Sequence, residues 1–306
     1  MLSGPGLDTH WTVRFLAGFL ILGGCATGGR VEGASDAAAK PDAPGTVDAL
    51  VVPGVDGPVS IDAPAPAAGS SLLLTEVVLA PSTGEFVEIA NPTGQTVDLS
   101  TYYLSDSGTY FRLPAGSPTV DSTDFIAQFP AGATIAPGAV ITVALDTTAN
   151  FQTAYATAPT FSIASGTMTS IAVNGTPNLT NAGEIVVVFQ WDGQADLVRD
   201  VDLVVAGVPT VANGLVDKSA MAFDGPDTGS ATTAYGTDTR TIAAQSTAPA
   251  SGKSTKRILR ETGHELQTGG GNGIAGDDET AEDTGATWDT VYTAPTPGVV
   301  PAGLLP

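Results

Sequence analysis

The sequence has few basic residues, one cysteine and almost no histidine. Only 11 lysines and arginines stand against 32 aspartates and glutamates, which gives a formal net charge of −21. A surface of that charge repels nucleic acid, so nucleic-acid binding through a basic surface is excluded. The lone cysteine, Cys25, excludes a disulfide within the chain. With only His10 and His264 present, histidine-based catalysis and a zinc site are poorly supported.

Long apolar segments and helix-favouring sequence are scarce as well. The apolar run Phe15–Leu22 is shorter than the ~20 residues that a membrane-spanning helix needs. The 37 glycines and 22 prolines disfavour long helices. Hydrophobic residues make up 42% of the chain, which is enough for a core, whereas only 14% are charged. This composition is typical of a turn-rich β protein.

The N-terminal region has the pattern of a cleaved and lipidated leader. Phe15–Leu22 has the length of a signal-peptide apolar region, and it leads into Leu22-Gly23-Gly24-Cys25-Ala26, which resembles a bacterial lipobox. We predict that residues 1–24 are a signal peptide and that Cys25 is lipidated and anchors the protein to a membrane. The alternative is ordinary secretory cleavage beside a chance cysteine. Ala26 differs from the aspartate that retains lipoproteins in the inner membrane, which favours the outer membrane, facing the periplasm or the cell surface.

Residues 25–71 are predicted to be a disordered tether. The segment repeats Asp-Ala pairs, as at Asp36-Ala37, Asp42-Ala43 and Asp48-Ala49, and it is rich in proline. Such a composition buries no core, and its carboxylates repel one another.

Period-two apolar runs separated by turn residues begin at Leu72. Three short strands are expected between Leu72 and Asp106, broken at Pro81–Gly84 and at Asn91–Gly94. Further strands are expected at 110–113, 139–145, 184–190, 197–205 and 253–259, with one short helix at 146–158. The pattern predicts an antiparallel, all-β fold.

Several of these segments also resemble a known family. They are T-E-V-V at 75–78, E-F-V-E-I-A-N-P at 85–92, V-D-L-S-x-Y-x-L-S-D at 97–106, F-P-A-G-x-x-I-x-P-G at 129–138 and N-L-x-N-x-G-E-I-V-V-V at 178–188. Together they resemble the lamin-tail domain, an immunoglobulin-like β-sandwich found in nuclear lamins and in many bacterial exported proteins. The resemblance implies one sandwich over residues 72–300 with long loop insertions, followed by a short tail at 301–306. It implies a fold and supplies no reaction.

An acidic cluster near the C-terminus is the sharpest candidate site. Glycines flank a run of five carboxylates, namely Asp277, Asp278, Glu279, Glu282 and Asp283. Calcium takes oxygen ligands of this kind, although the spacing is not that of an EF-hand. We therefore predict a calcium site here, and the alternative is a solvated acidic loop.

Glu76, Glu85 and Glu88 occupy the first two predicted strands. We expect them to accept hydrogen bonds from backbone or hydroxyl donors at the edge of the sheet. The alternative is that two of them face each other as a glycosidase pair.

These observations favour a non-catalytic cell-envelope lipoprotein that serves surface binding, adhesion or envelope organisation. Its expected partners are the membrane, through the lipid anchor, and a protein or glycan that the sequence does not identify. No cofactor other than calcium is expected. Two alternatives stay open at this point, a calcium-dependent structural or binding module and a carboxylate-based hydrolase.

Overall fold

The computed structural model describes residues 72–208, 215–238, 248–260, 271–274, 276, 278–281 and 283–306. The predicted signal peptide and tether, including Cys25, lie outside these residues. Within the described ranges no helix has the length and apolar character needed to cross a membrane.

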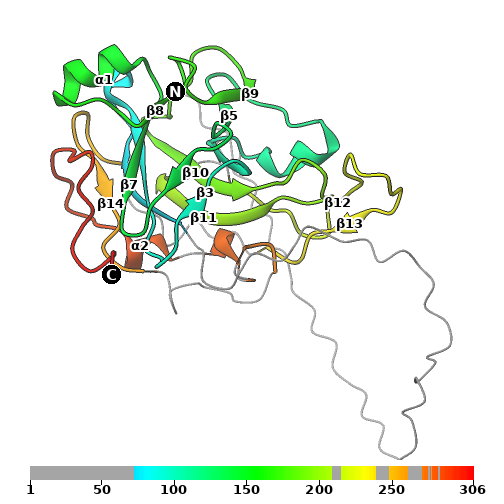
Figure 1. The fold of residues 1–306 in the computed structure, drawn as a ribbon. Helices are drawn as coiled ribbons and strands as arrows, with labels where there is room; N and C mark the ends of the chain where they lie inside the picture. Colours follow the sequence, from blue (N-terminus) through cyan, green and yellow to red (C-terminus); the bar gives the residue numbers. More distant parts are fainter. Residues whose placement is uncertain are drawn as a thin grey trace, which may run out of the picture. The chain divides into compact units, whose positions relative to one another are not determined.

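Two five-stranded sheets form the domain (Figure 1). The first sheet contains, in spatial order, β14 (Thr255–Lys256), β1 (Leu73–Val78), β2 (Phe86–Ala90), β7 (Val140–Ala144) and β8 (Phe161–Ser162). The second contains β11 (Arg199–Gly207), β10 (Gly183–Gln190), β4 (Tyr102–Ser105), β5 (Phe125–Gln128) and β9 (Thr169–Val173). Every pair of neighbours is antiparallel except β7 and β8.

Short elements complete the described chain. Two small ladders pair β3 (Val97–Asp98) with β6 (Thr134–Ile135) and β12 (Ala222–Phe223) with β13 (Thr233–Ala234). The helical elements are η1 (Ser82–Gly84), η2 (Tyr110–Ala115), α1 (Thr148–Tyr155), η4 (Glu279–Ala281) and α2 (Thr284–Thr287).

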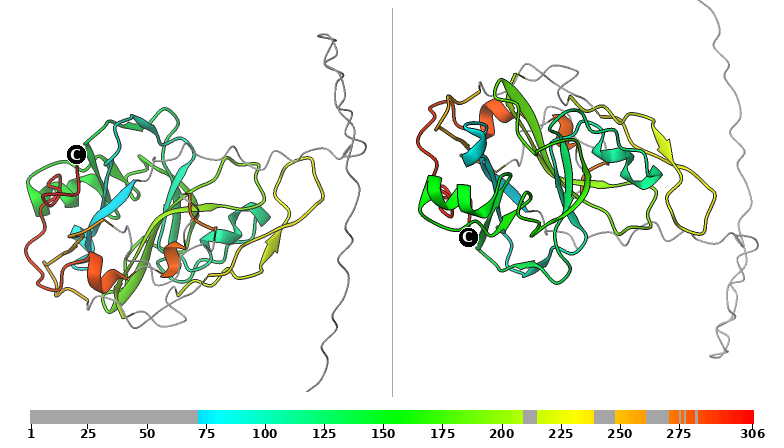
Figure 2. Two further views of the ribbon diagram at one scale, coloured as in Figure 1. Left: turned by 90° about the horizontal axis from the view of Figure 1, so that it is seen from below. Right: turned by 90° about the horizontal axis from the view of Figure 1, so that it is seen from above.

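The main core lies between the two sheets, which pack face to face (Figure 2). In β10, Val186 and Val188 enter this core. The alternate residues Val187 and Phe189 point the other way, into a second cluster that η2 and residues 216–235 cover. Because side chains alternate along a strand, this arrangement buries both faces of β10 and explains its continuous apolar sequence.

The outer face of the first sheet is covered by α1. Phe86 of β2 meets Phe151 and Tyr155 of α1 with ring centroids 5.6 Å and 5.3 Å away. The helix begins after Thr147, whose side-chain oxygen accepts a hydrogen bond from the Asn150 backbone N–H, as an N-cap residue does. The expected short helix is thereby confirmed.

A buried ion pair ties the two sheets together. The register of β1 against β2 shifts between Leu74 and Glu76, at a bulge. There the Arg257 guanidinium donates to the Leu74 carbonyl at 2.7 Å and to Asp202 of β11 at 2.7 Å, while Asp202 accepts from the Leu74 N–H. The Trp288 ring stacks on the guanidinium at 5.0 Å. The side chains of Arg257, which directly follows β14, and of Asp202 in β11 thus satisfy the backbone of Leu74.

Three expected strands differ from the structure. The third strand expected between Leu72 and Asp106 is divided into β3 and β4, which belong to different sheets. Residues 110–113 form the 3-10 helix η2 rather than a strand, because Pro114 lies in the segment and Gly116 closes it in the left-handed region at φ 64°. The last core strand, expected over 253–259, is reduced to Thr255–Lys256. There Arg257 turns its side chain inward to the ion pair. The immunoglobulin-like all-β architecture itself is confirmed.

Candidate functional site

Three carboxylates from separate parts of the chain meet at one end of the second sheet. They belong to Asp106, Asp124 and Glu184, and one ligand oxygen from each lies within 4.8 Å of the other two. We call these residues the acid trio. Asp106 follows β4, Asp124 precedes β5, and Glu184 lies near the start of β10. β4 lies between β5 and β10 and runs antiparallel to both. The end of β4 and the starts of β5 and β10 therefore lie at the same end of the sheet.

Hydrogen bonding leaves the acid trio incompletely satisfied. Asp106 is 1% exposed, and its Oδ1 accepts from the Phe125 N–H at 2.7 Å. Its Oδ2 is buried and has no hydrogen-bond partner among the described residues. Glu184 accepts backbone N–H groups of Thr180 and Ile185, each at 3.2 Å. A buried carboxylate oxygen without a donor is costly, so this oxygen points to a missing ligand.

The electrostatics of the acid trio favour a cation. Burial raises the pKa of Asp106 well above its usual value, and the nearby charges of Asp124 and Glu184 raise it further. Burial likewise raises the pKa of Glu184 to about 7, with a further contribution from Asp124. Burial also raises the pKa of Asp124, which is the half-exposed member and opens the cluster to solvent. A bound divalent ion would replace this mutual repulsion by attraction and restore the ionised forms.

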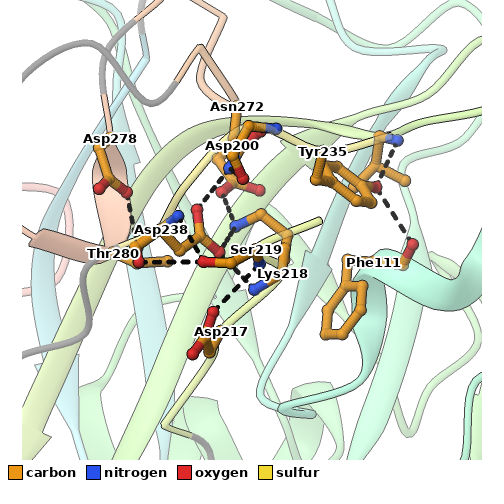
Figure 3. Close-up of polar contacts among 12 residues, drawn as sticks. Phe111, Asp200, Asp217, Lys218, Ser219, Tyr235, Asp238, Asn272, Asp278 and Thr280 are labelled. Atoms are coloured by element: carbon orange, nitrogen blue, oxygen red, sulfur yellow. Dashed lines mark hydrogen bonds and ion pairs between the residues drawn. The ribbon is translucent and has the colours of Figure 1, made fainter. Parts of the chain in front are cut away.

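A second constellation lies on the other face of the same sheet (Figure 3). The Lys218 ammonium is fully buried and lies 2.6 Å from Asp200 Oδ2 and 3.1 Å from Asp238 Oδ2. The Tyr110 hydroxyl donates to Asp200 Oδ1 at 2.6 Å. Asn272 donates its side-chain amide to Asp238 Oδ1 and so orients that carboxyl group. The insertion 215–238 thereby places a lysine and an aspartate against the start of β11, at Asp200.

The strand glutamates accept hydrogen bonds from backbone and hydroxyl donors, as expected, but β1 and β2 lie inside the sheet and not at its edge. Glu76 accepts from the Thr296 N–H at 3.0 Å, and Glu88 accepts from the Gly298 N–H at 2.6 Å and from the Thr75 hydroxyl at 2.9 Å. Glu85 accepts from the Leu179 N–H at 2.9 Å. Although Glu76 and Glu88 are cross-strand partners, both are occupied by backbone donors.

The predicted calcium loop is described only in part. Asp277 and Glu282 lie outside the described residues, so a site built from all five carboxylates stays a prediction. Asp278 and Glu279 are buried, and Asp278 accepts from the Thr280 hydroxyl at 2.6 Å, whereas Asp283 is half-buried. The alternative of a solvated loop is therefore wrong for Asp278 and Glu279, which pack beside β11 through η4. The predicted lipidation site, Cys25, also lies outside the described residues.

Sequence reasoning missed both constellations. Asp106 closes one of the family-like motifs and Glu184 opens the core of another, but only the strand order shows that they meet. Asp200 and Asp202 carry a local signal, because two aspartates within a long apolar strand require buried partners. Lys218 and Asp238 lie in a stretch without periodicity, where no local pattern marks them.

The comparisons with known proteins agree with this architecture. The family model described as the Lamin Tail Domain matches residues 65–201, which include the strands from β1 to β10 and the whole acid trio. No curated protein and no solved structure matches the chain. Lamin tail domains are immunoglobulin-like and generally non-enzymatic, so the sandwich is a binding or structural module. Residues 65–201, around which the sandwich is built, belong to the lamin tail domain family.

Proposed function

We propose that this protein is a non-catalytic, lipid-anchored module of the bacterial cell envelope whose lamin tail domain is held in its working form by Ca²⁺ at the acid trio. The observation that carries the calcium part is the buried Asp106 Oδ2, which has no donor among the described residues. It belongs to a carboxyl group that lies beside two further carboxylates. A cation satisfies this oxygen and removes the repulsion among the three acids.

Calcium suits the acid trio better than magnesium. Calcium accepts six to eight oxygen ligands in irregular geometry, including bidentate carboxylates and water, whereas magnesium demands a near-ideal octahedron. The trio offers carboxylate oxygens from Asp106, Asp124 and Glu184, and solvent reaches the half-exposed Asp124 to complete the shell. An ion here joins the ends of β4, β5 and β10, so its role is structural and its loss loosens one end of the sheet.

The anchor and the tether determine where such a module works. A lipidated Cys25 followed by Ala26 favours the outer membrane. The 46-residue tether between Ala26 and Ser71 spans about 40 Å as a coil, which lets the domain reach a partner away from the bilayer. The net charge of −21 favours a partner with a basic surface, either a protein or a cationic glycan.

Thermal unfolding with and without calcium tests the proposal. Millimolar CaCl₂ is expected to raise the melting temperature of the wild type above the value in sodium chloride of matched ionic strength, and EDTA is expected to reverse the shift. Asp106→Asn should lose this calcium-specific shift. The control variant Asp192→Asn removes the same charge from an exposed turn, where asparagine can still accept the hydrogen bonds of Asp192. Equal shifts in calcium and in sodium would contradict the proposal.

A further inference from the structure

We propose that Lys218 and Asp200 form an intramolecular isopeptide bond, an amide between Lys218 Nζ and Asp200 Cγ, with Asp238 transferring the proton. The two reacting groups are already in contact, with Nζ 2.6 Å from Oδ2 of the carboxyl group. The inference is independent of the calcium proposal, because the two clusters share no residue.

The surroundings exclude water from both partners. The side chains of Lys218, Asp200 and Asp238 have no exposed surface. The Tyr110 and Tyr235 rings lie 5.7 Å and 5.9 Å from the Lys218 nitrogen. Amide formation releases water to the bulk, and a dry site opposes hydrolysis of the product. A lysine and two aspartates are an expensive set of charges to bury. An amide bond removes the charges of Lys218 and Asp200, while Asp238 Oδ2 keeps its hydrogen bond from the Lys218 backbone N–H at 2.7 Å.

The proton balance closes inside the cluster. Burial raises the pKa of Asp200. Burial lowers the pKa of Lys218, but the charges of Asp200 and Asp238 outweigh it and raise that pKa above its usual value, so the ion pair is the resting form from which the reaction starts. Transfer of one proton from the Lys218 ammonium to Asp200 Oδ2 converts the ion pair into an amine and a carboxylic acid with no change in total charge. The amine then attacks Cγ and forms the carbon–nitrogen bond. Asp238 takes a second proton from the nitrogen and returns it to Oδ2, and that oxygen departs as water. Asp238 ends the sequence in its starting form.

Two further contacts suit this chemistry. The Tyr110 hydroxyl donates to Asp200 Oδ1, the oxygen that stays as the amide carbonyl, and it stabilises the negative charge that develops there during attack. Asn272 holds Asp238 Oδ1, which leaves Oδ2 directed at Lys218. The amine, the acyl group, the proton carrier and the oxyanion donor are therefore all in place before reaction.

The bond would close a covalent ring through residues 200–218 and fasten the insertion to β11. Such a ring lowers the conformational freedom of the unfolded chain, as a disulfide does in other proteins. The single cysteine, Cys25, cannot form a disulfide within the chain. An amide between side chains is a covalent cross-link that this chain can still form.

Peptide mapping of the purified full-length protein tests the bond. Trypsin cleaves after Arg199, Lys218 and Arg240, and the sequence contains no other lysine or arginine between these sites. An unmodified chain therefore yields the separate peptides 200–218 and 219–240. With the bond present, trypsin cannot cleave after Lys218, and a single peptide 200–240 appears, lighter than its sequence by one water molecule. Fragment spectra should place the link between Asp200 and Lys218.

The missed cleavage separates the isopeptide from other losses of water. A succinimide at Asp224-Gly225 also removes one water, but it leaves Lys218 open to trypsin. Lys218→Arg keeps the cleavage site and the charge and should give peptides 200–218 and 219–240 at their sequence masses. Asp238→Ala keeps both reacting groups and should reduce the linked fraction strongly; full linkage in that variant would refute its role as proton carrier. Recovery of peptide 200–218 from the wild type at its unmodified mass, without the linked species, would overturn the proposal.

Discussion

Replacement of Glu85 by glutamine is expected to remove one of the larger contributions to the pH dependence of folding. Glu85 is 1% exposed and accepts hydrogen bonds from the Leu179 N–H and the Asn178 side chain, each at 2.9 Å. Burial raises its pKa from the usual 4.5 to about 8. Between these two values the folded state keeps a proton that the unfolded state has released. The unfolded state therefore binds fewer protons, and the free energy of unfolding falls as the pH rises through this window.

The magnitude follows from the two pKa values. Each pH unit inside the window costs about 1.4 kcal/mol for one group, so neutral pH, some 2.5 units above 4.5, costs at most about 3 kcal/mol. Glutamine never ionises, and its carbonyl oxygen can still accept from the Leu179 N–H, while the Asn178 amide can rotate to offer its oxygen. Glu85→Gln should therefore be more stable than the wild type near pH 7 and about equally stable near pH 4.5.

Urea denaturation followed by tryptophan fluorescence measures this effect, because the buried Trp288 ring reports on packing between the sheets. The series runs between about pH 5 and pH 8, with EDTA present so that no ion occupies the acid trio. The Asp192→Asn variant, altered at an exposed turn, controls for the loss of one negative charge. Parallel curves for the wild type and Glu85→Gln across the series would refute the reasoning.

Two further predictions concern the buried Arg257–Asp202 ion pair and the predicted lipid anchor at Cys25. Arg257→Met leaves the buried Asp202 without its cation and should lower the free energy of unfolding by about 3–5 kcal/mol in urea denaturation; a loss below about 1 kcal/mol, the range of exposed pairs, would contradict the role given to this pair. Cys25→Ala should move the protein from the membrane fraction to the soluble fraction, and intact mass should show lipid on Cys25 in the wild type alone. A soluble wild type with a free thiol would argue against the anchor.

Local sequence predicted the strands well and the sites poorly. The buried strands β2 and β10 are visible as apolar runs bounded by turns, because their burial is a property of the segment itself. The acid trio depends instead on strand order, since Asp106 and Glu184 lie far apart in sequence and meet only because β4 pairs with β10. The short run Tyr110-Phe111-Arg112-Leu113 predicts a strand, but the following proline and glycine favour a 3-10 turn.

The site residues in the insertion 215–238 are the hardest to predict from local sequence. Lys218 and Asp238 lie in a polar stretch, and neither composition nor periodicity distinguishes them from surface residues. Their burial depends on aromatic residues elsewhere in the chain, chiefly Tyr110 and Phe189. These form an apolar surface on one face of the second sheet, and the insertion packs over that surface and buries it. In the same way, the burial of Asp278 beside β11 is a tertiary effect that an acidic, glycine-flanked sequence does not predict.

Calorimetric titration of the EDTA-treated full-length protein with CaCl₂ tests the central claim most directly. We predict saturable binding that Asp106→Asn abolishes and that the exposed-turn variant Asp192→Asn preserves. The protein with Asp277, Asp278, Glu279, Glu282 and Asp283 all replaced by their amides should retain binding at the acid trio, which separates this site from the C-terminal loop. Wild-type heats no larger than those of Asp106→Asn would contradict the account.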